Sequence, residues 1–448
     1  MSREGGYGLN ILVISQYWAP ENGVPQRRWT WLTEILERAG HNVTVIAPPP
    51  HYNQDMSIED WLRDSSFCST VEQQSGNTAE TIVRTGFFPS GRSLTRRIVN
   101  QAAVAVAGLW VVFRRPGPLK DFNPDLVIGT VPALPTAVVT YLASRRFKAP
   151  YIVDLRDAWP DLIRESERWN SSMGKPSLRE RFLRHGPLQT LGWITTRSLN
   201  FSLRRANGIL VTASRLRESL KVRYPNASGK PSKRIALVRN VFPIQVQGFK
   251  KEVHSVERAE LRVLYAGTIG RAQNLANAVH AAKLAKDRGI NVRLRFVGTG
   301  AACQELAKLA RKNQVEAEFS SRIEPENLAE HYQWADTALV HLTDWKPLEN
   351  AVPSKTYELM SIGLHISAVV SGEAAELVEL HQAGHTVPPE SPAELARMWE
   401  TLLADPKLLE VSENGAMWVE KQRTIASPRE LLRLIESFDN RNATKANS

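Results

Sequence analysis

The chain has 448 residues and 42% hydrophobic residues, so it is long for a single core and predicts two or three domains. Its two cysteines, Cys68 and Cys303, lie far apart, which excludes a disulfide framework and a cysteine zinc site and favours a reducing, cytoplasmic compartment. The formal net charge is +11, and the sequence shows no secretory signal and no apolar run near the ~20 residues that span a bilayer.

The first half opens with a predicted strand at 9–15, LNILVIS. A loop containing Asn22 and Gly23 follows, and an amphipathic helix around Trp29 leads to a second strand at 42–47. Residues 54–93 are polar and have no clear period, so we predict an insertion or a mobile loop there.

The positive charge is concentrated between Arg84 and Arg205, where 20 Lys and Arg face 8 Asp and Glu. Within this segment, residues 102–113 are apolar, and arginines lie on both sides of them. Two interpretations fit equally well: a helix in the headgroup layer of an anionic membrane, or a core helix that covers a sheet. Nucleic acid ranks lower, because no DNA- or RNA-binding signature accompanies the charge.

Further predicted strands continue an alternation of strands and helices through both halves of the chain: 125–129, 151–154, 208–212, 261–267, 291–297, 337–342 and 364–370. We predict two doubly wound parallel-sheet domains, at 1–241 and 261–448, joined by a hinge at 242–260. The last helix could pack back on the N-terminal domain.

The segment 353–363, PSKTYELMSIG, predicts a short helix that begins after a proline and ends at Gly363. Lys355 and Glu358 are three residues apart, so they share one face of its first turns. There a diphosphate can bind the lysine and backbone N–H groups, while the glutamate accepts hydrogen bonds from ribose hydroxyls. The alternative is a solvated ion pair. The strands on both sides favour the ligand site, because ligands gather at the carboxyl ends of parallel strands.

Two glycine-containing loops also follow predicted strands. Gly298-Thr299-Gly300 is a weak match to a dinucleotide-binding fingerprint, because Cys303 stands at its third glycine position. It predicts a tight turn that can approach a ligand, or a plain structural turn. In the other loop, which contains Gly267 and Gly270, Arg271 can neutralise a diphosphate.

Residues 154–161, DLRDAWPD, follow a strand and combine three carboxylates with Arg156 and Trp159. This density of polar groups at a strand end indicates a site, or a capping cluster at a helix start. The sequence contains no Asp-x-Asp pair, so we expect no metal and no cofactor, and protein cations must balance a diphosphate.

Taken together, these motifs resemble the GT-B glycosyltransferases of family 4, in particular the bacterial branch that builds surface polysaccharides and glycolipids. The resemblance covers nearly the whole chain. It rests on six motifs in order: YWAPENG with its arginines (17–28), DLRDAWPD (154–161), YAGTIGRAQN (265–274), FVGTG (296–300), the turn at Arg322 and Ile323, and PSKTYELMSIG (353–363).

The resemblance implies two Rossmann-like domains facing across a cleft, and a retaining, metal-independent transfer. The C-terminal domain would bind the nucleotide sugar, with Glu358 on the ribose, Lys355 and the Arg271 loop at the diphosphate, and backbone around Arg322 at the base. Gly267, Gly298 and Gly300 complete this predicted donor site. The acceptor would face Gly23, Arg27, Arg28 and Arg156, and Lys355 would stabilise the leaving diphosphate.

The chain departs from the family pattern at two places. Eight residues before Glu358, where the family often has a first glutamate, this chain has Asn350, with Glu349 beside it. Many members carry a histidine just after the strand that ends here at Gly129, where this sequence reads Thr130-Val131-Pro132. These departures leave the general base open, and Asp157 is a candidate for it.

The sequence predicts a glycosyltransferase that moves a hexose or N-acetylhexosamine from a UDP-type donor to a lipid-linked or glycan acceptor. We expect it on the inner face of the plasma membrane, with no nucleic acid as partner. Two alternatives remain: a GT-B sugar-nucleotide epimerase, and a non-catalytic membrane or nucleic-acid adaptor.

Overall fold

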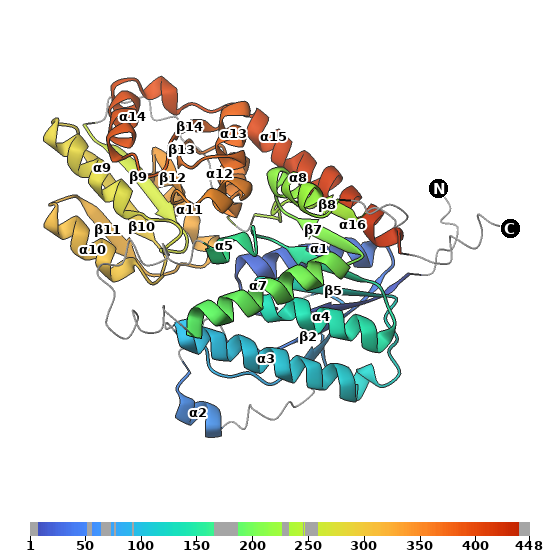
Figure 1. The fold of residues 1–448 in the computed structure, drawn as a ribbon. Helices are drawn as coiled ribbons and strands as arrows, with labels where there is room; N and C mark the ends of the chain where they lie inside the picture. The colour runs from blue at the N-terminus through green and yellow to red at the C-terminus, as the bar shows by residue number, and fades with distance from the viewer. Residues whose placement is uncertain are drawn as a thin grey trace. The chain divides into compact units, whose positions relative to one another are not determined.

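The computed structural model describes residues 8–51, 56–63, 73–75, 78–91, 94–164, 187–225, 233–244, 246 and 259–438. The chain forms two compact units (Figure 1). Unit 1 comprises residues 1–160, 187–242 and 425–448, and unit 2 comprises 161–186 and 243–424. The C-terminal segment thus belongs to unit 1, and most of the predicted hinge, 247–258, lies outside the described residues.

Unit 1 is built on an eight-stranded sheet in the order β3-β4-β2-β1-β5-β6-β7-β8. All neighbours pair in parallel except β3, which pairs antiparallel with β4 at one edge. The central strands are fully buried apolar runs, as expected for a sheet covered on both faces. The strands are β1 (Asn10–Ile14), β2 (Asn42–Ala47), β3 (Gln73–Ser75), β4 (Thr81–Arg84), β5 (Leu126–Val131), β6 (Tyr151–Leu155), β7 (Gly208–Val211) and β8 (Arg234–Leu237).

The helices of unit 1 are α1 (Val24–Arg38), α2 (Ile58–Arg63), α3 (Leu94–Arg114), α4 (Leu134–Phe147), α7 (Pro187–Arg205), α8 (Ser214–Arg223) and α16 (Ser427–Glu436), with a 3₁₀ turn at Gly117–Leu119. Right-handed crossovers place α3, α4 and α7 on one face of the sheet, because their strands step in the same direction. Accordingly, α4 packs between α3 and α7, and the three helices lie side by side in Figure 1. Helix α16 packs against β8 and α1.

Two sequence predictions for unit 1 require correction. The polar segment 54–93 was predicted as an insertion or a mobile loop, and the loop alternative is wrong for its described part, which contains α2, β3 and β4. Helix α3 has 21 residues rather than the 12 of its apolar stretch, because the mixed polar and apolar residues 94–101 extend its first turns. By length and composition α3 could cross a membrane, although core helices of soluble proteins meet the same criteria. Within its most apolar window, 28% is buried.

Unit 2 is built on a six-stranded parallel sheet in the order β11-β10-β9-β12-β13-β14. Its strands are β9 (Leu261–Ala266), β10 (Val292–Val297), β11 (Ala317–Ser320), β12 (Thr337–His341), β13 (Ile366–Val369) and β14 (Gly384–Val387). On one face α9 packs against α14, and Trp399 lies fully buried in that core.

The helices of unit 2 are α5 (Asp161–Arg164), α9 (Ala276–Asp287), α10 (Cys303–Lys312), α11 (Ala329–Trp334), α12 (Ser354–Ile362), α13 (Glu373–Leu380), α14 (Pro392–Ala404) and α15 (Asn414–Lys421). Shorter turns are η4 (Pro325–Leu328), η5 (Lys346–Asn350) and η6 (Pro406–Leu409). A π-helical turn, Gln422–Ala426, leads from α15 into α16.

Candidate functional site

The predicted donor residues of unit 2 all follow the carboxyl ends of strands. Gly267 and Arg271 lie in the loop after β9, Gly298 and Gly300 in the loop after β10, and Arg322 after β11. Helix α12 begins after β12 and η5. Because these strands are parallel neighbours in one sheet, the loops meet at one edge of unit 2.

Helix α12 has the predicted bounds for clear local reasons. Pro353 precedes it, and Gly363 ends it in the left-handed conformation at φ 67°, which a glycine adopts without strain. Pro353, the residue before the helix, makes no side-chain hydrogen bond to its first turn. The N–H groups at the start of α12 have no acceptor within the helix, and such helix starts bind anions.

Lys355 and Glu358 form an ion pair on this helix. The ammonium Nζ lies 3.1 Å from Oε2 of Glu358, and the two side chains are 25% and 8% exposed. Burial makes this pair less screened than an ordinary surface pair. The carboxylate and the ammonium therefore occupy one half-buried position at the start of α12.

The sequence analysis missed Tyr332, which joins this pair. Its hydroxyl donates to Oε1 of Glu358 at 2.7 Å and accepts from Lys355 Nζ at 3.0 Å. The side chain is 1% exposed and comes from α11, directly before β12. Nothing in the sequence connects residues 332 and 358, because the contact depends on how α11 and α12 pack around β12.

The two glycine-containing loops pack against each other through their backbones. A Cβ on Gly298, at φ 148°, would lie 1.9 Å from the carbonyl oxygen of Gly267, and a Cβ on Gly300 would lie 2.1 Å from that of Ile269. The Ile269 N–H donates to the carbonyl of Thr299 at 3.0 Å. Gly298 and Gly300 therefore have a structural reason to be glycine, independent of any ligand.

A buried histidine fixes the Arg271 loop to β12. Nε2 of His341 lies 3.1 Å from the amide of Asn277, and the Thr343 N–H donates to the carbonyl of Ala272 at 2.8 Å. Burial lowers the pKa of His341 to about 3, although backbone hydrogen bonds at Gln273 and Leu342 raise it in part. The ring is therefore neutral at neutral pH, and it holds the loop without adding charge to the edge.

In unit 1, Arg28, one of the predicted acceptor residues, lies in a fully buried ion pair. Its guanidinium pairs with both carboxylate oxygens of Asp154, at 2.9 and 3.3 Å, and both side chains are 0% exposed. It also donates to the carbonyl of Val238 and to the side chain of Asn240. The indole of Trp29 donates to Asp154 as well, so this cluster ties α1, β6 and the segment after β8 together.

Arg156 differs from Arg28 because part of its guanidinium lacks a partner. Nε donates to the carbonyl of Val131, but the buried Nη2 has no hydrogen-bond acceptor among the described residues. The side chain is 6% exposed and follows the carboxyl end of β6. A buried donor of this kind is costly unless a ligand or water satisfies it.

Asp157 lies beside this guanidinium. Burial raises the pKa of Asp157, although Arg156 and a hydrogen bond from Trp159 lower it in part. A carboxylate with a raised pKa is better suited to accept a proton near neutral pH. The environment of Asp157 is therefore compatible with its predicted role.

The other predicted acceptor residues lie at the start of α1. Gly23 is the residue before the helix, in an extended conformation, and the guanidinium of Arg27 stacks on Phe242 at 4.5 Å. The sequence analysis also missed a buried polar cluster near the end of β1. There the amide of Gln16 donates to Asn100 at 2.8 Å and lies 3.3 Å from Nε2 of His51.

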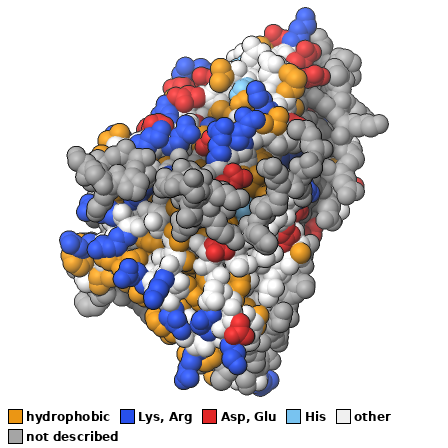
Figure 2. Space-filling view, turned by 90° about the vertical axis from the view of Figure 1, so that its right-hand side faces the viewer, with side chains coloured by type: hydrophobic (Ala, Val, Ile, Leu, Met, Phe, Trp, Pro, Cys, Tyr) orange, Lys and Arg blue, Asp and Glu red, His pale blue; other side chains and the backbone are white. Residues whose placement is uncertain are grey.

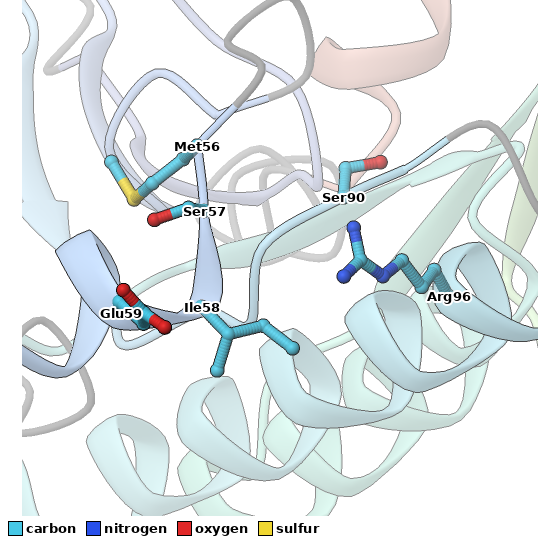
Figure 3. Close-up of a pocket in the computed structure, with 6 residues that line it drawn as sticks. All are labelled: Met56, Ser57, Ile58, Glu59, Ser90 and Arg96. Carbon is cyan, nitrogen blue, oxygen red and sulfur yellow. The ribbon is translucent and has the colours of Figure 1, made fainter.

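A surface pocket of about 380 Å³ lies elsewhere on unit 1, between α2 and the start of α3 (Figure 3). Glu59 of α2 and Arg96 of α3 line it together with Met56, Ser57, Ile58 and Ser90. The lining combines one negative charge, Glu59, with one positive charge, Arg96, and none of the six residues is a predicted site residue. We therefore assign no ligand to this pocket. Within the described ranges, no group of three or more His, Cys, Asp and Glu side chains is arranged to hold a metal ion.

Comparison with known proteins finds two family models along the chain. The glycosyl transferase 4-like domain matches residues 23–240, and the glycosyl transferases group 1 model matches residues 247–418. The chain belongs to glycosyltransferase family 4, group 1. This confirms the family that the six motifs indicated, and it makes the chain a glycosyltransferase of glycan biosynthesis.

A curated relative supports the same conclusion. WcaI of Escherichia coli, which carries the name of a colanic acid biosynthesis glycosyl transferase, is 23% identical over 386 residues. The match covers 85% of this chain and 87% of that protein.

Solved structures confirm the predicted GT-B fold. Sucrose-phosphate synthase from Thermosynechococcus elongatus matches with a TM-score of 0.64 and 14% identity over 97% of this chain and all of that one. HepE from Anabaena, solved in complex with UDP-glucose, matches with a TM-score of 0.58 and 14% identity over 96% of this chain and all of that one. WaaG, a glycosyltransferase involved in lipopolysaccharide biosynthesis, matches with a TM-score of 0.58 and 13% identity. The match covers 96% of this chain and 99% of that one.

Proposed function

We propose that this glycosyltransferase transfers a hexose or N-acetylhexosamine from a UDP-sugar to a lipid-linked or glycan acceptor in cell-envelope glycan synthesis, with retention of configuration and without a metal. Unit 2 binds the donor and unit 1 binds the acceptor at the inner face of the plasma membrane. The observation that carries the proposal is the cluster of Lys355, Tyr332 and Glu358 near the start of α12.

The cluster offers the two kinds of contact that a nucleotide sugar needs. Lys355 and the N–H groups at the start of α12 supply positive charge for a diphosphate, and Glu358 supplies an acceptor for ribose hydroxyls. In this structure the ammonium rests between Glu358 and Tyr332. A diphosphate that draws Lys355 toward itself leaves Oε2 of Glu358 for the ribose, so one side chain movement prepares both contacts.

During transfer, negative charge develops on the departing diphosphate. Lys355 and the cation of Arg271 stabilise that charge and so lower the barrier. The HepE complex with UDP-glucose supports the choice of a UDP donor, as a property of a protein with the same fold. In unit 1, the buried Nη2 of Arg156 could donate a hydrogen bond to an anionic group on the acceptor. Asp157 is the candidate general base.

The test is calorimetric titration of the chain with UDP-, GDP- and ADP-sugars. Replacing Lys355 or Glu358 by alanine should weaken donor binding or use at least tenfold, about 1.4 kcal/mol. Lys308, an exposed lysine of α10 paired with Glu305, provides the matched control as Lys308→Ala. Unchanged donor binding in both site variants would refute the site.

Incubation of the donor without an acceptor separates transfer from epimerisation. A transferase leaves the donor sugar unaltered or slowly hydrolyses it to UDP and free sugar. An epimerase converts it into an isomeric UDP-sugar, and that product would contradict the proposal.

A further inference from the structure

Helices α3, α4 and α7 form a layer with an unusual charge composition. Together they contain eight arginines and no aspartate, glutamate or lysine. All eight arginines are exposed, and five of them lie at the C-terminal ends of the three helices: Arg114, Arg145, Arg146, Arg204 and Arg205. By contrast, α1, α8 and α16 of the same unit each carry glutamates.

The same layer exposes most of the large apolar side chains of the described chain. Eight of the fifteen exposed large hydrophobic residues lie on α3 and α7. They are Val99, Val106, Trp110 and Phe113 on α3, and Leu191, Trp193, Ile194 and Phe201 on α7. Figure 2 shows Lys and Arg side chains interspersed with hydrophobic ones over the lower part of one face of the molecule.

Helix α3 has two apolar stripes. One stripe, with Val104, Val111 and Val112, is buried, and a Cβ on Gly108 would lie 3.7 Å from Val139 of α4. The opposite stripe, from Val99 through Val106 and Trp110 to Phe113, has steps of seven, four and three residues, which keep it on one helix face, and it faces outward. A surface helix normally shows polar residues there, so the outward stripe calls for an apolar partner.

The macrodipole accounts for part of this pattern, because cations at helix C-termini are stabilising. It does not account for exposed tryptophans, nor for the lack of any acidic residue in three helices. Arg197 stacks over Trp193 at 5.0 Å and Arg205 over Phe201 at 3.9 Å, so cations and aromatic rings share the α7 surface. Aromatic rings beside arginines match the boundary between lipid headgroups and acyl chains.

We infer that the outer face of α3, α4 and α7, the arginine layer, is a docking surface for an anionic lipid bilayer on which unit 1 lies without crossing it. The inference rests on the proposed membrane-side function and specifies the surface that serves it. A second copy of the chain is a poorer occupant, because a two-fold interface would bring arginines against arginines. The bilayer supplies both the apolar interior and the negative surface that this layer lacks.

The test is co-sedimentation of the purified chain with vesicles of phosphatidylcholine alone or mixed with phosphatidylglycerol. An apolar variant carries Val106→Gln, Trp110→Gln and Trp193→Gln. A cationic variant carries Arg145→Gln, Arg146→Gln, Arg204→Gln and Arg205→Gln. Controls place equal changes at exposed residues elsewhere: Val222→Gln, Leu380→Gln and Met417→Gln for the first, and Arg38→Gln, Lys221→Gln, Lys283→Gln and Lys308→Gln for the second.

We expect the wild type to bind phosphatidylglycerol vesicles, with an affinity that falls as salt rises. The cationic variant should lose at least tenfold on those vesicles, and the apolar variant should lose at least tenfold on both kinds, while both controls bind as the wild type does. Unchanged binding in both layer variants would overturn the inference. So would retention on vesicles after alkaline carbonate extraction, which would mean that α3 crosses the bilayer.

Two further readouts separate the inference from its rivals. Titration with UDP-sugars should give wild-type affinity in every layer variant, so a chain that binds vesicles through this layer but binds no nucleotide sugar would refute the proposed function alone. Light scattering reports self-association. If the wild type is a dimer and the apolar variant is a monomer, while vesicle binding is unchanged, the layer contacts a second copy of the chain instead.

Discussion

At the residue scale, Arg28 and Asp154 have no exposed surface, so each charge depends on the other and on its hydrogen bonds. Removing one partner of such a pair leaves an uncompensated buried charge and costs about 3–5 kcal/mol. We expect Asp154→Ala to lower the free energy of unfolding of unit 1 by that amount. Urea denaturation followed by tryptophan fluorescence measures it.

The control for that prediction is Glu305→Ala, which breaks the exposed pair with Lys308. An exposed pair contributes little, and the change should stay within about 1 kcal/mol. The double variant Arg28→Met, Asp154→Leu removes both charges and should recover part of the lost stability. Equal losses in the single and double variants would show that the pair is not what stabilises this position.

Tyr332 leads to a prediction about donor binding. Tyr332→Phe removes the hydrogen bond to Glu358 and the acceptor for Lys355 while it keeps the ring. A hydrogen bond to a charged group contributes about 1.5–3 kcal/mol, so donor affinity should fall by roughly tenfold or more. Calorimetric titration with a UDP-sugar measures the change.

A matched tyrosine lies in unit 1. The hydroxyl of Tyr151 donates to the carbonyl of Ser202 at 2.5 Å, and the ring is 2% exposed. Tyr151→Phe should destabilise unit 1 but leave donor affinity at the wild-type value. If both phenylalanine variants weaken donor binding equally, Tyr332 acts through general stability and not through the cluster.

The difference between local and distant contacts explains which site residues the sequence could reveal. Lys355 and Glu358 lie on one helix three residues apart, so the spacing alone predicted their shared face. Tyr332 reaches them only through the packing of two helices around β12. Arg28 lies 126 residues from Asp154, so no local sequence pattern shows that a buried ion pair neutralises its charge.

At the element scale, two glycines with positive φ differ in their surroundings. A Cβ on Gly289, at φ 82°, meets nothing within 4 Å, whereas a Cβ on Gly298 meets the carbonyl of Gly267 at 1.9 Å. Gly289→Ala should cost about 1 kcal/mol, the conformational penalty alone. Gly298→Ala should cost clearly more and weaken donor binding, because it pushes the two glycine-containing loops apart.

Chemical denaturation gives the stabilities of both alanine variants, and titration with a UDP-sugar gives their affinities. Donor binding should be intact in Gly289→Ala. Equal stability losses at the two positions would contradict the close approach of the loops.

Strand β12 carries a pH-dependent contribution through His341. Its pKa is lowered to about 3 in the fold, so the unfolded chain takes up a proton near pH 6.5 that the folded unit excludes. The stability of unit 2 is therefore fully present above about pH 6.5. It should fall toward pH 3 with an added slope of about 1.4 kcal/mol per pH unit from this residue.

His341→Gln keeps a polar partner for Asn277 but does not titrate. Urea denaturation of both proteins between pH 4 and 8 should show a shallower acid slope for the variant. Identical slopes would show that His341 does not exclude the proton.

Most buried strands were predictable, although buried β4 was missed, and the edge strands were not. Strands at 42–47 and 261–266 are mostly apolar, and the sequence located them to within one residue. By contrast, β11 is half-buried and β14 reads GHTV, so neither has a hydrophobic pattern that distinguishes it from a loop. Both owe their strand conformation to pairing with the neighbouring central strands.

At the scale of the whole molecule, the chain contributes residues 161–186 to unit 2, completes most of unit 1, builds the rest of unit 2 and returns to unit 1 with α16. Leu431, Leu434 and Ile435 of that helix are buried, and Arg234 donates to the carbonyl of Ser437 at 2.6 Å. Each buried side chain of this size contributes about 1.5–3 kcal/mol. Deleting residues 425–448 should therefore lower the unfolding temperature of unit 1 and leave that of unit 2 unchanged.

Differential scanning calorimetry of full-length and shortened chains tests this. The Asp154→Ala variant identifies which transition belongs to unit 1. A shortened chain whose two transitions both match the full-length protein would show that α16 does not stabilise unit 1.

The return of α16 also sets an order of events during synthesis. Most of unit 1 leaves the ribosome first, yet β8 and α1 receive their covering helix only after all of unit 2 has been translated, because α16 follows unit 2 in the chain. We therefore expect this chain to depart from the usual order, in which the N-terminal domain completes its folding first. Unit 2 can complete its core while the nascent chain is still attached to the ribosome. Unit 1 begins to fold earlier, and we expect it to finish later, because it needs α16.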